Sequence, residues 1–353
     1  MKVGLIVPAN LKYSPYVKYY TDVLSREKVD YCIMSWDKAG IEEAADMAYS
    51  YKTSDFDRKR ILLGHLKFAF KCRKYIRKEK IDHLIIFTIA PLYFLGYKYV
   101  KRFRGKLIID IRDDSPFRRR FPRELQRFSR LAKLLVVSST YYAEWFDRKS
   151  ILCHNVDKTM MDQYSSPYGQ TQFRQPVRIV FAGMMIEEVE NIRVIKVLGN
   201  RVEFELVYVG RDNEGKNKVK QFVNDHSIRN VSFEGEYRKE DIVNIYRKEA
   251  DLVNILREET LINRNALPNK FYDAVLSGIP IVVYGHNKAI ADYVNQYKLG
   301  VVLHSNENIG EAILRYIQTF DSAEYTAGRE EFLHLVKSDL RRFEKHLLRF
   351  CGE

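Results

Sequence analysis

The residues best suited to chemistry in this chain lie in one stretch, 257–284. Its sequence predicts a polar loop, a short helix that begins at Pro268, a turn at Gly278 and a buried strand over 281–283. A helix N-terminus carries partial positive charge and free N–H groups, so it suits a phosphate. The carboxylate of Asp273, one turn further into the helix, could hold a sugar hydroxyl. The polar side chains expected at or near this N-terminus are Arg257, Arg264, Asn265, Asn269, Lys270 and Asp273.

A second polar cluster follows an apolar run in the segment LIIDIRDDSP, residues 107–116. Asp113 is the candidate for an acceptor-side carboxylate, which would orient or deprotonate a hydroxyl within about 3 Å. Arg112 is its candidate catalytic neighbour. The alternative is structural, because Asp113 or Ser115 is also suited to cap the next helix.

Strands and helices alternate through both halves of the chain. Near-continuous apolar strands separated by helices predict two doubly wound, parallel α/β domains, whose ligands bind at the carboxyl ends of the strands. The strands expected in the first half are residues 2–7, 29–34, 83–87, 107–110, 134–137 and 150–152. Those expected in the second half are residues 177–182, 204–209, 231–233, 250–254, 281–283 and 300–303.

Composition divides the chain into four parts. We expect an N-terminal domain over 1–157, a linker rich in Gln, Ser, Tyr and Pro over 158–176, and a C-terminal domain over 177–328. Residues 329–353 would form one helix whose apolar stripe either packs as core or forms a coiled-coil dimer. That stripe comprises Phe332, Val336, Leu340, Phe343, Leu347 and Phe350.

Loops at the strand ends supply further candidates. Glycines follow three strands of the second half, at Gly183, Gly210 and Gly235, where they would let the backbone approach a ligand closely. The first loop lacks a G-x-G-x-x-G fingerprint, so a dinucleotide site of the dehydrogenase type is not expected there. Asn10, Tyr13 and Tyr16 in that region either line an acceptor site or belong to an ordinary loop.

The charge and the cysteine content indicate what kind of partner and which cellular compartment to expect. The 353 residues carry a formal net charge of +13, which predicts an anionic partner. Four scattered cysteines without a CxxC pair argue against a zinc site and a disulfide framework, and they favour a reducing compartment. The start of the chain does not resemble a signal peptide, and no apolar run approaches the ~20 residues that span a bilayer. We therefore expect a cytoplasmic protein that is either free or peripheral at the inner face of the cell membrane.

Two basic segments have alternative readings. Residues 58–78 predict an amphipathic helix, with Leu62, Leu66 and Ala69 on its apolar side, that either crosses between strands or docks on anionic lipid. Residues 118–130 interleave arginines with Phe121 and Phe128. A membrane-proximal or lipid-diphosphate surface is favoured there over a nucleic-acid site.

The motifs resemble those of GT-B glycosyltransferases, in particular the retaining family 4 enzymes of bacterial capsule and O-antigen synthesis. In that family a P-x-K sequence, an acid and a G-x-P-V/I turn follow a polar loop, as in Pro268-Asn269-Lys270, Asp273 and 278–281 here. A second element, D-x-R-D-x-x-P, matches Asp110, Arg112, Asp113 and Pro116. The resemblance implies two Rossmann-like domains facing a cleft, with the last helix crossing back to the N-terminal domain.

The resemblance also implies roles for individual residues. Asp273 would contact the ribose, and Glu236 and Tyr237 would lie beside the base. Asn265 replaces a family glutamate, and the segment 154–157 (HNVD) replaces P-N-G-V-D. Met184 and Glu190 stand where family members usually have basic residues that grip the diphosphate. The candidate substitutes for those basic residues are Arg193, Arg257, Arg264 and Lys270.

The function expected from the resemblance is transfer of a sugar from a UDP- or GDP-sugar to a lipid-linked glycan. The reaction would retain anomeric configuration and use neither a metal nor another cofactor, and the protein would be a monomer or homodimer. A GT-B nucleotide-sugar epimerase and a non-catalytic subunit of a glycosyltransferase complex are the alternatives. A nucleic-acid binder is a weaker third, and we expect no nucleic-acid partner.

Overall fold

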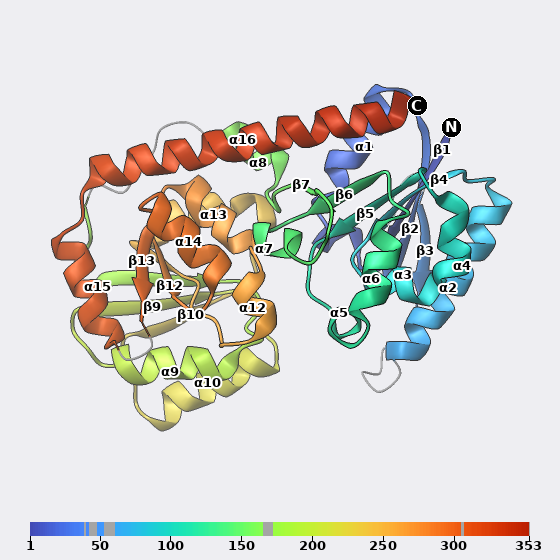
Figure 1. The fold of residues 1–353 in the computed structure, drawn as a ribbon. Coiled ribbons are helices and arrows are strands. Elements are labelled where there is room, and N and C mark those ends of the chain that lie inside the picture. Colours follow the sequence, from blue (N-terminus) through green and yellow to red (C-terminus); the bar gives the residue numbers. More distant parts are fainter. Residues whose placement is uncertain (39, 42–47, 53–60, 165–171, 305–306, 353) are drawn as a thin grey trace. The chain divides into compact units, whose positions relative to one another are not determined.

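The computed structural model describes residues 1–38, 40–41, 48–52, 61–164, 172–304 and 307–352. The chain forms two compact units, one made of residues 1–155 with 337–353 and the other of residues 156–336 (Figure 1). Each unit contains a parallel sheet with helices packed against it, so the predicted doubly wound α/β class is confirmed.

The sheet of the first unit has seven strands within the described residues, in the order β3-β2-β1-β4-β5-β6-β7. Its strands are β1 (Lys2–Val7), β2 (Asp30–Asp37), β3 (Ala48–Lys52), β4 (His83–Phe87), β5 (Leu107–Ile111), β6 (Leu134–Val137) and β7 (Ile151–Leu152). Edge strand β3 was not predicted, because its residues AYSYK are more polar than the runs that mark central strands. The helices of this unit are α1 (Val17–Arg26), α2 (Ile61–Lys78), α3 (Ala90–Leu95), α4 (Tyr97–Val100), α5 (Pro116–Arg120), α6 (Pro122–Ser129) and α7 (Thr140–Ala143).

Helix α2 is rotated relative to the prediction. Leu62 and Leu66 are 57% and 52% exposed, whereas Ala69, the third residue of the predicted apolar side, is buried together with Phe68 and Cys72. The stacking of Phe68 on Trp36, with ring centroids 5.5 Å apart, shows which face meets the sheet. Residues 58–60 of the predicted helix lie outside the described part of the chain. The leucines expected on the core side therefore face away from it.

The sheet of the second unit has six described strands in the order β10-β9-β8-β11-β12-β13. They are β8 (Val177–Ala182), β9 (Phe204–Val209), β10 (Val231–Glu234), β11 (Leu252–Asn254), β12 (Ile281–Tyr284) and β13 (Gly300–Leu303). The helices are α8 (Lys158–Tyr164), α9 (Glu188–Leu198), α10 (Glu214–Asp225), α11 (Ile242–Glu249), α12 (Leu261–Asn265), α13 (Asn269–Ser277), α14 (Lys288–Gln296) and α15 (Ile309–Gln318). Helix α8 lies within the predicted linker, and residues 165–171 of that linker lie outside the described residues.

The last helix, α16 (Ser322–Gly352), begins seven residues before the predicted start at Arg329. Its apolar stripe is buried: Phe332 packs on Phe271 in the second unit, and Phe343 packs edge-on against Tyr20 in the first. The portion from Lys337 onward belongs to the first unit. Since the chain itself covers this stripe, it offers no free seam for the coiled-coil alternative.

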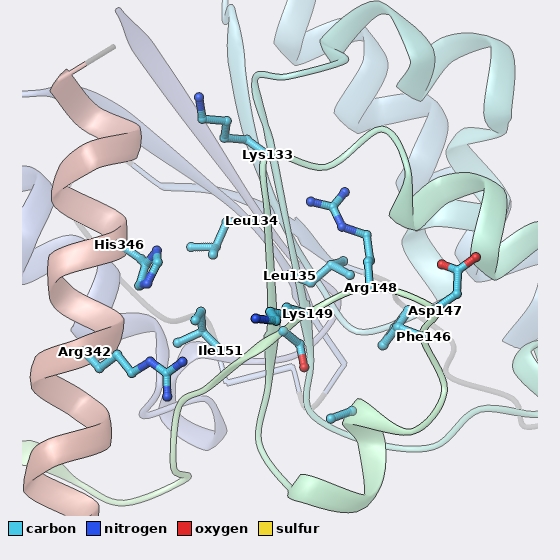
Figure 2. A pocket seen from close by; sticks show the side chains of 12 residues that line it. Lys133, Leu134, Leu135, Phe146, Asp147, Arg148, Lys149, Ile151, Arg342 and His346 are labelled. Atoms are coloured by element: carbon cyan, nitrogen blue, oxygen red, sulfur yellow. The ribbon is translucent and has the colours of Figure 1, made fainter.

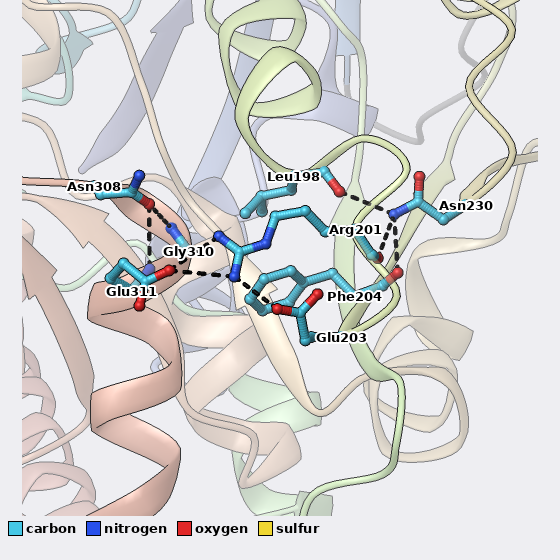
Figure 3. A network of polar contacts seen from close by, with 8 residues as sticks. All are labelled: Leu198, Arg201, Glu203, Phe204, Asn230, Asn308, Gly310 and Glu311. Carbon is cyan, nitrogen blue, oxygen red and sulfur yellow. Dashed lines mark hydrogen bonds and ion pairs between the residues drawn. The ribbon is translucent and has the colours of Figure 1, made fainter.

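A network of hydrogen bonds and ion pairs connects the segments at the amino end of the second sheet (Figure 3). The side-chain amide of Asn230, just before β10, donates to the carbonyl oxygens of Leu198, Arg201 and Phe204 at 2.9, 3.2 and 2.9 Å. Arg201 in turn donates to Glu311 in the first turn of α15. The end of α9, the start of β9 and the start of α15 are thereby held together.

We expect Asn230→Ala to lower the free energy of unfolding by about 1–3 kcal/mol, because three carbonyl groups lose the hydrogen bond that this side chain donates. The midpoint of urea unfolding followed by circular dichroism measures the effect. Asn224→Ala, on the exposed face of α10, is the matched control and should change stability by less than about 0.5 kcal/mol. Equal midpoints for the two variants would contradict the role given to Asn230.

Candidate functional site

The second sheet has its topological switch point between β8 and β11. Strands β9 and β10 extend to one side of β8, and β12 and β13 extend to the other side of β11. Open α/β sheets bind ligands outside the carboxyl ends of their strands at such a point. Gly183 directly follows β8, and Arg257 follows β11 after two buried residues. The segment with the predicted binding residues therefore begins at the switch point.

The structure corrects two details of that segment. Residues 261–265, predicted as loop, form helix α12, because the Thr260 hydroxyl caps it by accepting from the Asn263 N–H at 3.1 Å. Pro268 is the N-cap of α13 and not its first helical residue. Gly278 ends α13 in the left-handed conformation, with φ of 74°, as predicted.

Lys270 reaches from the first turn of α13 to the end of β8. Its Nζ lies 3.8 Å from the centroid of the Phe181 ring. A Cβ placed on Gly183 would lie 3.8 Å from the same Nζ. Burial, and then the charge of Arg257, lower the pKa of Lys270 to about 7. An anion bound here would favour the protonated amine, so the site is suited to a phosphate.

At two of the three strand-end positions the backbone conformation requires glycine, and at the third it does not. Gly183 and Gly210 have φ of 128° and 155°. A Cβ on Gly210 would lie 2.3 Å from the carbonyl oxygen of Gly183, so the two loops pack backbone to backbone. At Gly235 a Cβ would meet open space, so the predicted close approach does not apply there.

Asp273 is the buried carboxyl group of the site, with 6% exposure. It forms an ion pair with Lys239, and burial raises its pKa above the usual range. Burial, and then the charge of Asp273, raise the pKa of Tyr237 to about 12. Glu236, in the same loop, is exposed. The predicted ribose-binding acid and the predicted base-side tyrosine therefore share one environment.

Asn269 offers an unused hydrogen-bond acceptor. It is the first residue of α13, and its side-chain Oδ1 is buried without a hydrogen-bond partner among the described residues. Buried polar atoms in folded proteins nearly always have a partner. Asn269 is thus a predicted site residue with a polar atom left for a ligand.

The other predicted phosphate-binding residues differ in their exposure and in the partners they contact. Arg257 donates to Glu187 at 3.1 and 3.0 Å. Arg193 is exposed and pairs with Glu190 at 3.8 Å. Arg264 is exposed in the last turn of α12, and Asn265 ends that helix half-buried.

Glu187 is a residue that sequence reasoning missed. Besides Arg257, its carboxylate accepts from the amide of Asn263 at 3.1 Å and from the backbone N–H of Glu258 at 2.7 Å. This acid therefore orients Arg257 beside Lys270. Its place directly before α9, where an acid is favourable, was the signal available in the sequence.

In the first unit, Arg112 is a buried structural partner of Asp110. The two side chains meet at 2.6 Å with 1% and 0% exposure, and Asp110 also accepts from the Tyr20 hydroxyl at 2.6 Å. Arg112 also donates to the carbonyl oxygen of Cys153 at 3.0 Å. Its guanidinium is therefore enclosed by the protein.

Asp113 follows Arg112 and is exposed beyond the end of β5. The Ser115 hydroxyl caps α5 by accepting from Phe117 N–H at 3.3 Å, so Ser115 fills the capping role that the sequence left open between it and Asp113. The acceptor-side role of Asp113 stays a prediction.

The three residues predicted to line an acceptor site in the first loop differ in their exposure. Asn10 is 2% exposed, and its amide donates to Asp37 at 2.6 Å, so it fastens the end of β1 to the end of β2. Tyr16 is buried, with the Arg112 guanidinium 4.5 Å from its ring centroid. Tyr13 is 48% exposed and the most accessible of the three predicted acceptor residues.

Two further residues mark the carboxyl edge of the first sheet. Thr88, directly after β4, has φ of 63°, a strained conformation for a β-branched residue, and its N–H donates to the Asp110 carbonyl oxygen at 2.7 Å. Sequence patterns do not reveal such strain. His154 is fully buried and bonds to Asp339 on α16 at 3.0 Å, which assigns it a structural role.

Within the part of the chain that the structure describes, no three His, Cys, Asp or Glu side chains gather as a metal site would require. The candidate site comprises Lys270, Arg257 and the first turn of α13, which no side chain caps.

Comparison with known proteins shows similarity at the level of structure. No protein-family model matches the chain, and no curated protein matches it by sequence. Sucrose-phosphate synthase from Thermosynechococcus elongatus matches with a TM-score of 0.71 at 11% identity, over 98% of each chain. The Anabaena protein HepE, solved in complex with UDP and glucose, matches with a TM-score of 0.62 at 13% identity, over 99% of this chain and 100% of that one.

A nucleotide-sugar epimerase is also among the similar structures. UDP-N-acetylglucosamine 2-epimerase from Rickettsia bellii matches with a TM-score of 0.62 at 10% identity, over 100% of this chain and 97% of that one. Since these matches cover nearly all of each chain, the whole chain has the GT-B fold of two Rossmann-like domains.

Proposed function

We propose that the protein is a glycosyltransferase that binds a nucleoside-diphosphate sugar at the carboxyl edge of its second sheet. The observation that carries the proposal is Lys270, held beside Gly183 at the switch point. The unused Oδ1 of Asn269 supports it, as does the similarity to a fold that HepE uses with UDP and glucose.

Each residue has a chemical task in this proposal. The diphosphate lies against the start of α13, where Lys270 and Arg257 supply positive charge as the leaving group gains negative charge. Asp273 accepts from the ribose hydroxyls, and Tyr237 lies beside the base. The donor is a UDP- or GDP-sugar, the anomeric configuration is retained and no metal is required.

A thermal-shift screen against UDP, GDP, ADP, CMP and their sugar conjugates, with and without magnesium, tests the proposal. A ligand at about 100 times its dissociation constant adds about 2.7 kcal/mol of stability. A response to one nucleotide supports the proposal and identifies the base. No response to any of them would favour the non-catalytic subunit.

The epimerase is a second candidate, because a solved epimerase shares the fold over the full chain. The two activities differ in their need for an acceptor. A glycosyltransferase releases free nucleotide and elongates a glycan when both substrates are present. An epimerase converts the nucleotide-sugar itself, so NMR of the sugar after incubation without an acceptor separates them.

In this proposal Asp113 orients or deprotonates the acceptor hydroxyl. We expect Asp113→Asn to lower turnover by about 100-fold or more while donor affinity changes less than about twofold, since general-base catalysis contributes about 10²–10⁴. Steady-state kinetics together with calorimetric titration of the donor measure both quantities. Asp30→Asn, at the amino end of β2, is an exposed control. Full activity of Asp113→Asn would exclude the residue from the reaction.

The acceptor we propose is a lipid-linked glycan of surface polysaccharide synthesis. Helix α2 supports attachment to an anionic membrane, because Leu62, Leu66 and Phe70 are 57%, 52% and 61% exposed beside the exposed Lys67 and Lys71. None of the described helices is both long and apolar enough to cross a bilayer. We propose a peripheral attachment through this exposed face of α2.

A further inference from the structure

A cavity of about 760 Å³ lies in the first unit, away from the candidate catalytic residues. It is lined by residues at the starts of β6 and β7 and by one face of α16 (Figure 2). Asp110 and Asp113 belong instead to the carboxyl end of the same sheet. The cavity is thus at the edge opposite to the one where doubly wound sheets bind their usual ligands.

The lining combines an apolar part with a cationic part. Leu134, Leu135 and Ile151 supply the apolar part from the strands, together with Phe146. Figure 2 shows Arg342 and His346 projecting from α16 toward Leu134 and Ile151. The basic lining residues are Lys133, Arg148, Lys149, Arg342 and His346. Cavities of about 300–1,000 Å³ are typical of small-molecule sites.

The positive charge of the cavity is not balanced by its own lining. Asp147 is the acid among the described lining residues, and it pairs with Arg130 at 2.8 Å. Arg148 donates to the carbonyl oxygens of Ser129 and Ala132, each at 2.8 Å, so these bonds hold its guanidinium without cancelling its charge.

Arg342 and Lys149 have no ion pair within the part of the chain that the structure describes, although both line the cavity. The field of this cluster acts on His346, whose pKa is lowered by partial burial and then by Arg349, Arg342 and Lys345. Like charges gathered around a concave surface repel each other and attract an anion.

We propose that this cavity binds a phosphate ester. The planar guanidinium of Arg342 can donate two parallel hydrogen bonds to phosphate oxygens, and the Lys149 ammonium can supply a second charge. The leucines and Ile151 cover the apolar or sugar part of the ester. Both a soluble sugar phosphate and a phospholipid head group present this chemistry. The inference does not depend on glycosyl transfer, because the donor site proposed above lies in the second unit.

NMR of the full-length protein labelled at histidine tests the site. The probes are sn-glycerol 3-phosphate, inorganic phosphate, and vesicles of phosphatidylcholine with or without phosphatidylglycerol. We expect glycerol 3-phosphate to shift the ring signals of His346, and the pKa of His346 to rise when the anion is bound. His346→Gln assigns the signal, and binding to the unlabelled variants is followed by calorimetry.

Arg342→Gln and Arg341→Gln form a matched pair, since both remove one exposed arginine of α16 but Arg341 does not line the cavity. We expect Arg342→Gln to weaken binding about tenfold and Arg341→Gln less than twofold, corresponding to one charge-assisted contact. Binding of sn-glycerol 3-phosphate without vesicle binding identifies a soluble ligand. Vesicle binding that needs phosphatidylglycerol and Arg342 identifies a lipid head group. Equal effects of the two variants, or unchanged His346 signals with every probe, would overturn the proposal.

Discussion

Replacing Lys270 with methionine is expected to weaken nucleoside-diphosphate binding by about 10- to 100-fold, the contribution of one or two charge-assisted hydrogen bonds. The free protein should be at least as stable as the wild type. Methionine keeps an apolar stem over Phe181 and removes an amine whose charged form is disfavoured by burial, as its pKa of about 7 shows. Calorimetric titration with the nucleotide found in the screen, together with urea unfolding, measures both effects.

The pH dependence of binding tests the same residue in the wild type. The pKa of Lys270 is about 7 in the folded protein and 10.5 without the fold, so between these values the unfolded chain binds more protons. Stability of the free protein therefore rises with pH across this window. The bound diphosphate favours the protonated amine, so affinity should fall by up to about tenfold per pH unit above pH 7. Lys270→Met should lose this dependence.

Lys196→Met is the matched control for Lys270→Met. Its Nζ also lies over a phenylalanine ring, 5.6 Å from the centroid of Phe222, but on the exposed side of α9. It should leave both the affinity and its pH dependence unchanged. Wild-type affinity that stays constant from pH 7 to 9 would remove Lys270 from the phosphate contact.

Replacing Arg112 with methionine is expected to lower the free energy of unfolding by about 3–5 kcal/mol, because it leaves the buried carboxylate of Asp110 without its cation. The comparison with Arg127→Met isolates the role of burial. Arg127 and Glu124 also meet at 2.6 Å, but their side chains are 52% and 37% exposed. That variant should change stability by less than about 1 kcal/mol. Urea unfolding of both variants provides the measurement.

A double-mutant cycle distinguishes the structural role of Arg112 from a catalytic one. Asp110→Asn removes the stranded charge and still leaves an oxygen that can accept from Tyr20. The double variant Asp110→Asn, Arg112→Met should therefore be more stable than Arg112→Met alone. If Arg112→Met keeps full stability and loses activity, the guanidinium acts on the substrate and our structural assignment is wrong.

Local patterns were sufficient to predict most of the fold. The apolar runs of β1, β4, β6, β8 and β9 coincide with their strands because interior strands of a parallel sheet are buried on both faces over most of their length. The run 300–303 also coincides with its strand, β13, although β13 is an edge strand. Strand β3 was missed because an edge strand needs fewer apolar residues. The rotation of α2 was also missed, since Leu66 and Phe68 are equally apolar and the position of Trp36 decides which of them is buried.

The candidate site was predictable where its residues are close in the sequence. Asn269, Lys270 and Asp273 share one helix start, and the proline before them and Gly278 after them define that helix. The sequence by itself therefore determined the class of fold, the place of the helix that we propose binds phosphate, and the excess of positive charge.

Tertiary structure alone decided which charges meet. The Glu187–Arg257 contact, the packing of the Lys270 ammonium over Phe181 and the enclosure of Arg112 each join residues from different strands or loops. The cationic cavity joins Lys149 to Arg342, nearly two hundred positions along the chain. Coulombic and desolvation energies depend on distance and on surrounding atoms in space, and a linear pattern specifies neither.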